Sequence, residues 1–308
     1  MPPSGDRVRA AGTGAALVAV AALLVGCGSQ TPSTAGVEVV TPPASRSAGT
    51  PSPYPTELIG EGLVLQDRSH GPQLCLGAVT ASMPAQCGGP DIPDWDWAKV
   101  GGEKTWAGTT DGRYVVIGHF DPGVNTFTLT RPAIPAAAYD GQPISPEPQP
   151  ALPGTPCSPP PGGWRVVDPA KTTDDTFERT VSRAAEMDGY AGAWVDQSRS
   201  TDPDRNDPKQ LILNVAFTHD LPAREQDLRE TWGGLLCVSK GLHTEDELKR
   251  IQGEVFEAAR SVTLSAGGGR DGVDLRLIYD DGTLQKRFDT TYGEGVVRVS
   301  SALTPYSG

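Results

Sequence analysis

The sequence predicts an α+β protein, with a small β-rich N-terminal domain followed by a ferredoxin-like α/β sandwich. Three observations predict this class: two Pro-rich low-complexity stretches separate the folded parts, the first folded part alternates short strand-like runs with Gly/Pro turns, and the second mixes helical and strand periodicity. We expect five segments, a signal peptide at residues 1–26, a disordered Ser/Thr/Pro-rich spacer at 27–56, the β-rich domain at 57–140, a Pro-rich linker at 141–163 and the α+β domain at 164–308.

The first residues have the features of a lipoprotein export signal. Arg7 and Arg9 precede an uncharged, mostly apolar run over residues 10–26, as in signal peptides. Residues 24–27 resemble a lipobox, in which cleavage occurs before a cysteine that becomes diacylated. The alternative is an ordinary secretory signal with a chance cysteine. We therefore predict lipidation of Cys27 and a position on the outer face of the cell membrane, with the lipid as the anchor.

Strands of the β-rich domain are expected where β-branched and aromatic residues gather, at residues 63–65, 74–76, 114–120 and 126–130. Between the last two strands, Pro122 fixes φ and Gly123 tolerates positive φ, which favours a tight turn. With no convincing helix, this part predicts a small barrel or sandwich.

The second folded part combines helices and strands. A helix capped by Thr172 or Thr173 should bury Phe177 and Val181 and stop at Gly189. Further helices are expected from Pro222 to Trp232, after a capping box at 244–247, and around Leu284 and Phe288. Strands are expected at residues 190–195, 211–217, 235–238, 273–279 and 296–299.

Once Cys27 is lipidated, four cysteines remain. Their even number, outside the cytoplasm, implies two disulfides. Of the three pairings we favour the one that joins Cys75 to Cys87 and Cys157 to Cys237, because the first closes a small loop and the second holds the linker's end on a buried strand. A zinc site needs cysteines closer together in sequence.

The composition and motifs argue against several activities. The formal net charge is −12 and no basic stripe is visible, so we expect no nucleic-acid partner. The four histidines form no metal-binding pair at helical spacing, and neither a nucleophile elbow nor a phosphate-binding loop occurs. We accordingly expect no metal, no cofactor and no catalytic residue of a known class.

Two acidic segments are candidate binding sites. Residues 202–208 space oxygen ligands as in a calcium loop but have Asp207 and Leu213 where such a loop has Gly and Glu. Asp94, Trp95, Asp96 and Trp97 form a candidate ligand patch of carboxylates and aromatic rings. The alternative for the patch is that both tryptophans cap the β-core.

Three stretches carry a family resemblance, residues 74–78 with 86–90, residues 231–239 and residues 292–299. Together they resemble uncharacterised lipoproteins of actinobacteria, over most of residues 57–305, and the resemblance implies no catalytic residue. Residues 191–196 followed by 211–215 are also similar to pro-regions of streptogrisin-type secreted proteases. Because no protease domain follows, that second resemblance implies a shared α+β fold at most.

These observations favour a non-enzymatic, membrane-anchored module that binds an extracellular protein or ligand. The alternative is an extracellular hydrolase of cell-envelope material that uses carboxylates such as Asp94 and Asp96. A third hypothesis, by analogy with the pro-regions, is regulation of a secreted protease.

Overall fold

The computed structural model describes residues 56–80, 82, 86–141, 144, 154–200 and 207–307, and shows an α+β protein with several sheets. Cys27, the predicted signal peptide and nearly all of the predicted spacer lie outside the described residues. So do residues 142–143 and 145–153 of the Pro-rich linker and residues 202–206 of the candidate calcium loop.

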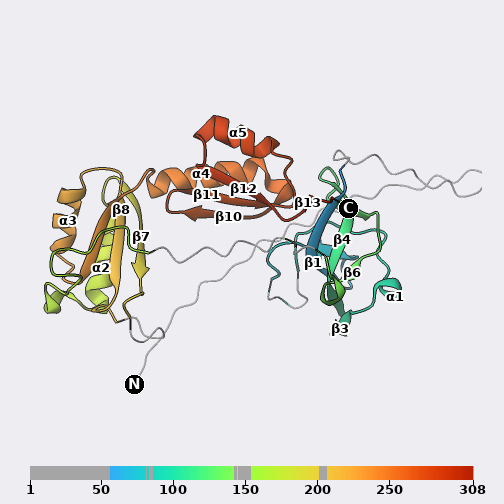
Figure 1. The fold of residues 1–308 in the computed structure, drawn as a ribbon, viewed down its shortest axis with the longest axis horizontal. Helices are drawn as coiled ribbons and strands as arrows, with labels where there is room; N and C mark the ends of the chain where they lie inside the picture. The colour runs from blue at the N-terminus through green and yellow to red at the C-terminus, as the bar shows by residue number, and fades with distance from the viewer. Residues whose placement is uncertain are drawn as a thin grey trace, which may run out of the picture. The chain divides into compact units, whose positions relative to one another are not determined.

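A seven-stranded antiparallel sheet forms the β-rich part (Figure 1). Its two long strands, β1 (Leu58–Gln66) and β4 (Thr109–Asp121), pair along the whole of β1, from Leu58 opposite Gly118 to Gln66 opposite Thr110. The shorter strands are β2 (Gln73–Cys75), β3 (Lys104–Trp106), β5 (Thr126–Leu129), β6 (Ile134–Pro135) and β13 (Thr304–Pro305). A single-turn helix α1 (Trp97–Val100) and a 3-10 turn η1 (Ala136–Ala138) complete it.

The predicted strands of this part are confirmed, since they overlap β1, β2, β4 and β5. The predicted turn after β4 is also present, where the Asp121 carboxylate accepts a hydrogen bond from the Gly123 amide at 2.8 Å and Asn125 has a φ of 51°. Alternation along β4 buries Tyr114, Val116 and Phe120 on one face and Val115 on the other, so both faces of the sheet pack.

Residues 174–240 form a first αββαβ module. It consists of α2 (Asp174–Ala185), β7 (Tyr190–Asp196), β8 (Ile212–Phe217), α3 (Leu221–Arg229) and β9 (Leu235–Lys240), preceded by the 3-10 turn η2 (Pro169–Lys171). β8 is the central strand, antiparallel to β7 and parallel to β9. Thr173 caps α2, as predicted, by accepting a hydrogen bond from the Thr176 amide at 3.2 Å.

Both faces of this three-stranded sheet are covered. Helices α2 and α3 pack on one face against Leu213, Val215 and Phe217, with Trp232 fully buried beside them. The other face buries Ile212, Leu235 and Cys237 under the segment that contains Cys157, Trp164 and Val166. The end of the linker is thus part of the folded structure.

Residues 245–301 repeat the same order of elements in a second αββαβ module (Figure 1). It consists of α4 (Glu245–Ala258), β10 (Thr263–Gly269), β11 (Gly272–Leu277), α5 (Thr283–Tyr292) and β12 (Val297–Ser301), with the 3-10 turn η3 (Arg260–Val262) after α4. Again the central strand, β11, is antiparallel to the strand before it and parallel to the strand after it. Helices α4 and α5 bury Leu248, Ile251 and Phe288 against Val273, Leu275 and Leu277.

The prediction of one ferredoxin-like sheet over residues 164–308 differs from the structure, which has two separate three-stranded sheets there. The difference arises because the two modules pack into different cores, the first around Trp232 and the second, around Leu275, into a core that includes the β-rich sheet. The strand β10 was also missed, because its Ser, Ala and Gly residues show no apolar alternation.

The second module and the β-rich sheet share one hydrophobic core. After β12 the chain continues into β13, which pairs with β1 so that Leu58 lies opposite Pro305 and Ile59 opposite Thr304. The buried Leu303 lies so close to Gly60 that a Cβ there would be 2.4 Å from the leucine Cδ2. A larger residue on β1 at this position would require the Leu303 side chain to move, and the core continues past it from Tyr114 to Leu275.

The structure contains two disulfides, and they join the predicted pairs, Cys75 with Cys87 and Cys157 with Cys237. Hydrogen bonds from the Thr155 amide and hydroxyl to the Asp196 carboxylate, at 3.0 and 2.8 Å, hold the same linker end. The second disulfide thus joins this linker end to β9, across 80 residues.

We predict that the double variant C157S/C237S loses about 4 kcal/mol of unfolding free energy, because the reduced chain no longer closes this long loop. The variant C75S/C87S, whose cysteines are 12 residues apart, should lose less, about 3 kcal/mol. Urea denaturation followed by circular dichroism measures both. A larger loss in C75S/C87S than in C157S/C237S would contradict the role assigned to the long loop.

Candidate interdomain binding cavity

A cavity of about 400 Å³ lies where the β-rich sheet meets the second αββαβ module. Its volume is in the range of small-molecule sites. The polar side chains that line it are Glu61, Arg113, Ser265 and Arg276, and the apolar ones are Leu76, Ala78, Ile144, Leu264 and Ala302. Gly62, Cys75 and Gly77 complete the lining.

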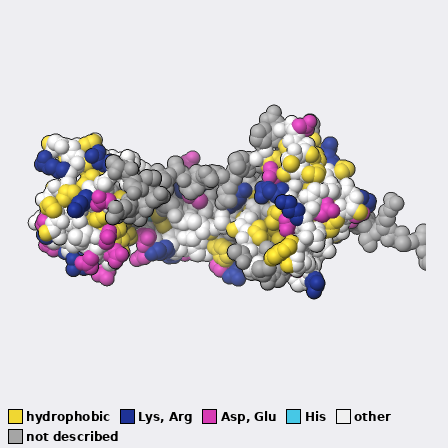
Figure 2. All heavy atoms as spheres, turned by 90° about the horizontal axis from the view of Figure 1, so that it is seen from below, with side chains coloured by type: hydrophobic (Ala, Val, Ile, Leu, Met, Phe, Trp, Pro, Cys, Tyr) yellow, Lys and Arg dark blue, Asp and Glu magenta, His cyan; other side chains and the backbone are white. Residues whose placement is uncertain are grey.

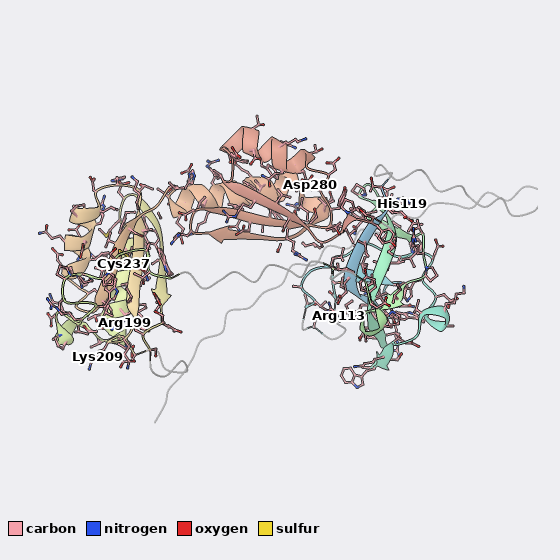
Figure 3. All side chains as sticks on the ribbon, in the orientation of Figure 1. Arg113, His119, Arg199, Lys209, Cys237 and Asp280 are labelled. Atoms are coloured by element: carbon pink, nitrogen blue, oxygen red, sulfur yellow. A yellow bond between two sulfur atoms is a disulfide. The ribbon has the colours of Figure 1, made fainter. Side chains whose placement is uncertain are left out.

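Glu61 and Arg113 form an ion pair at this cavity. Arg113 lies on β4 (Figure 3), and its Nη2 and Nε donate to Glu61 Oε1 at 2.9 and 3.2 Å. The Arg113 and Glu61 side chains are 63% and 36% exposed, so solvent weakens the attraction and the pair adds little stability. Their two charges nevertheless compensate each other.

Arg276 enters the cavity from the second module and has no such partner. It alternates along β11 with Leu275 and Leu277, which face the helices, so its side chain lies on the helix-free face of the sheet. Its Nε is buried and makes no hydrogen bond within the described structure. A buried donor that lacks an acceptor costs free energy, so this atom is the least satisfied polar group of the cavity.

Arg298 lies on the same face of the sheet as Arg276 but, unlike Arg276, forms an ion pair. Arg298 on β12 donates to both carboxylate oxygens of Asp274, from Nε at 2.7 Å and from Nη2 at 3.0 Å. The hydrogen bond that Arg298 donates to Asp274 raises the pKa of Arg298, against the opposing effect of burial. Arg276 follows Asp274 by two residues on β11 but forms no ion pair within the described residues.

The apolar wall is built by a register shift in β10. Pairing with β11 shifts between Thr263 and Ser265, which explains how the consecutive residues Leu264 and Ser265 can both line the cavity. Leu264 packs against the backbone of the opposite wall, since a Cβ on Gly77 would lie 3.3 Å from the Leu264 Cβ. This part of the cavity lining therefore combines Gly77 of the β-rich part with Leu264 of the second module.

The Cys75–Cys87 disulfide supports the wall formed by residues 75–78. It ties β2 to residues 86–90, and the Leu74 amide donates to the Pro90 carbonyl at 2.8 Å. The two chains approach so closely that a Cβ on Gly89 would lie 1.7 Å from the Leu74 carbonyl oxygen. Gly89 is therefore required for this contact.

The predicted patch at residues 94–97 lies elsewhere on the β-rich part. Trp95 is only 9% exposed and packs edge-to-face against Tyr114 and Trp97, with ring centroids 4.8 and 5.3 Å apart. Trp97 Nε1 donates to Gln66 at 2.7 Å. Asp96 caps α1 through the Ala98 amide and pairs with Lys99 at 2.9 Å, and these hydrogen bonds, Lys99 first, lower the pKa of Asp96. Packing accounts for the tryptophans, and ligand binding by Asp94 and its neighbours stays a prediction.

The histidines are dispersed over the fold. His119 lies on β4, towards the opposite end from Arg113 (Figure 3), with its Nδ1 3.3 Å from the Thr56 carbonyl oxygen. Among the described residues, no group of three or more His, Cys, Asp or Glu side chains could hold a metal ion.

Acidic and basic side chains are interspersed on the face shown in Figure 2, where many carboxylates have a basic neighbour. Within the described parts of the chain, no helix is both long and apolar enough to cross a membrane.

Sequence reasoning missed all four polar residues of the cavity. Glu61, Arg113 and Arg276 each lie on a strand between two buried residues, a pattern that only indicates a solvent-facing position, and Ser265 is an exposed residue of β10. The contacts between β1, β2 and β10 that bring them together involve residues about 200 positions apart, and no local signal marks them.

No known protein family, curated protein or solved structure matches this chain. The resemblance to actinobacterial lipoproteins, and the weaker one to protease pro-regions, therefore stay predictions.

We predict that Gly89→Ala destabilises the protein by about 3 kcal/mol, because the added methyl group would overlap the Leu74 carbonyl and force the cavity wall to move. Gly88→Ala is the matched control, since a Cβ there meets no atom within 4 Å, and its change should stay within about 0.5 kcal/mol. Urea denaturation measures both changes. Equal stability of the two variants would show that residues 86–90 do not pack on β2 as described.

Proposed function

We propose that this chain is an extracytoplasmic lipoprotein, anchored to the membrane through a lipidated Cys27, whose folded part is a non-enzymatic binding module. Its partner is a ligand or protein outside the cell. The division into a β-rich domain at residues 57–140 and an α+β part at 164–308 belongs to this proposal, with the cavity between the β-rich sheet and the second module as the binding site.

The export signal and the disulfides support the location. Residues 1–27 have the order of a lipoprotein signal, and the two disulfides are of the kind that persists in oxidising compartments. Both observations favour the outer face of the cell membrane.

The cavity carries the binding part of the proposal. It combines aliphatic side chains with polar ones, among them Arg276 with a buried, unpaired Nε, and ligand sites likewise combine apolar surface with a few polar groups that fix orientation. Hydrolysis by Asp94 and Asp96 gains no support, because the Asp96 carboxylate is occupied as a helix cap and neither residue lines this cavity.

We predict that the unmodified chain incorporates labelled palmitate and sediments with membranes, and that Cys27→Ser abolishes both, because the diacylglyceryl group that carries the acyl chains is attached to that sulfur. Autoradiography of the immunoprecipitated protein and fractionation of the cells measure these outcomes. Ser29→Ala, two residues further on, is the matched control and should keep the label. Labelling that persists in Cys27→Ser, or is absent from the unmodified chain, would contradict the anchor.

A further inference from the structure

The unpaired guanidinium of Arg276 indicates what kind of ligand the cavity takes. An arginine side chain stays protonated, so its buried Nε is always a donor of a charged group. The backbone around it is fixed, because Arg276 pairs with Ser265 on β10 and Ser300 on β12. The described residues supply no acceptor for this donor.

The charges that line the cavity favour an acceptor with a single negative charge. Arg113 and Arg276 contribute two positive charges and Glu61 one negative charge, and Glu61 is bound to Arg113. One positive charge, that of Arg276, remains. A monoanion compensates it, whereas a dianionic phosphate monoester would leave an extra negative charge beside Glu61.

The shape of a guanidinium favours a carboxylate among monoanions. Two parallel N–H groups of arginine match the two oxygens of a carboxylate, as Nε and Nη2 of Arg298 do with Asp274 on the same sheet face. Ser265, opposite Arg276 in the β10–β11 register, lines the same cavity and offers a hydroxyl donor beside this position.

The remaining walls define the rest of the ligand. Leu76, Ile144, Leu264 and Ala302 present aliphatic surface to the cavity. Burial of an apolar chain against such side chains is favourable, and it lowers the local dielectric around the ion pair.

We infer that this cavity binds a small organic acid with an apolar body, whose carboxylate is held by Arg276. This inference rests on the proposed function and names the ligand class of that site. Arg276 positions the charged end, and the leucines and isoleucine hold the apolar end.

The test is isothermal titration of the full chain carrying Cys27→Ser, at neutral pH, with three probes of equal chain length, octanoate, octanol and octyl phosphate. We expect octanoate to bind at least tenfold more tightly than either other probe. Arg276→Gln should weaken octanoate at least tenfold and leave octanol unchanged, and Arg276→Lys, which keeps the charge but loses the forked donors, should give an intermediate loss. Arg287→Gln, on α5 of the same module and outside the cavity lining, is the matched control and should bind octanoate like the unmodified chain.

Each contrary result overturns a distinct statement. Equal binding of octanoate by Arg276→Gln, or tighter binding of octyl phosphate, would refute the carboxylate site. If octanol binds as well as octanoate, the cavity still binds ligands, and only the proposal that it selects a carboxylate is refuted. If no probe binds, the inference fails, while the palmitate labelling of Cys27 still decides the anchor.

Arg276→Gln should unfold at no lower urea concentration than the unmodified chain, because it breaks no ion pair, and a failure to fold would contradict the unpaired state of Arg276.

Discussion

The pairing of β13 with β1 joins the second αββαβ module to the β-rich sheet. It brings residues 302–306 across a strand almost 250 positions earlier in the sequence, with the Tyr306 amide donating to the Glu57 carbonyl at 2.8 Å. The Arg131 guanidinium lies 4.7 Å from the centre of the Tyr306 ring and strengthens the contact on the outer side of the sheet. Through Leu303 and Gly60, the pairing joins the core of the second αββαβ module to that of the β-rich sheet.

The cavity is a consequence of this joined core. One wall comes from the β-rich sheet and the Cys75–Cys87 loop, and the other comes from β10 and β11. A ligand that contacts both walls would stabilise their association, because it binds only the state in which they meet. The disulfide and the strand pairing hold the walls in place before a ligand binds. The walls therefore lose less conformational entropy when the ligand binds.

Local features of the fold could be predicted from the sequence, and long-range ones could not. The Thr173 and Thr244 caps and the turn at Asp121 are short-range hydrogen-bonding patterns, and the structure contains all three. The disulfide pairing followed from the number of cysteines and the loop that each pair closes. By contrast, β10 has too few apolar side chains to show a period, and the division into two modules depends on which strands pair. Arg276 looked like a surface residue because a charge that alternates with buried leucines gives no sign that its side chain lines a cavity against the β-rich sheet.

Hydrogen exchange of the full chain, with and without Leu303→Ala, measures whether the β-rich sheet and the second module share one core. Leu303 is fully buried at the junction. If the sheet and the module share one core, the amides of β4 and β11 both lose protection against exchange in the variant. The amides of β8, which belongs to the separate core around Trp232, keep their protection. Loss of protection in β11 alone, with β4 unchanged, would contradict a shared core.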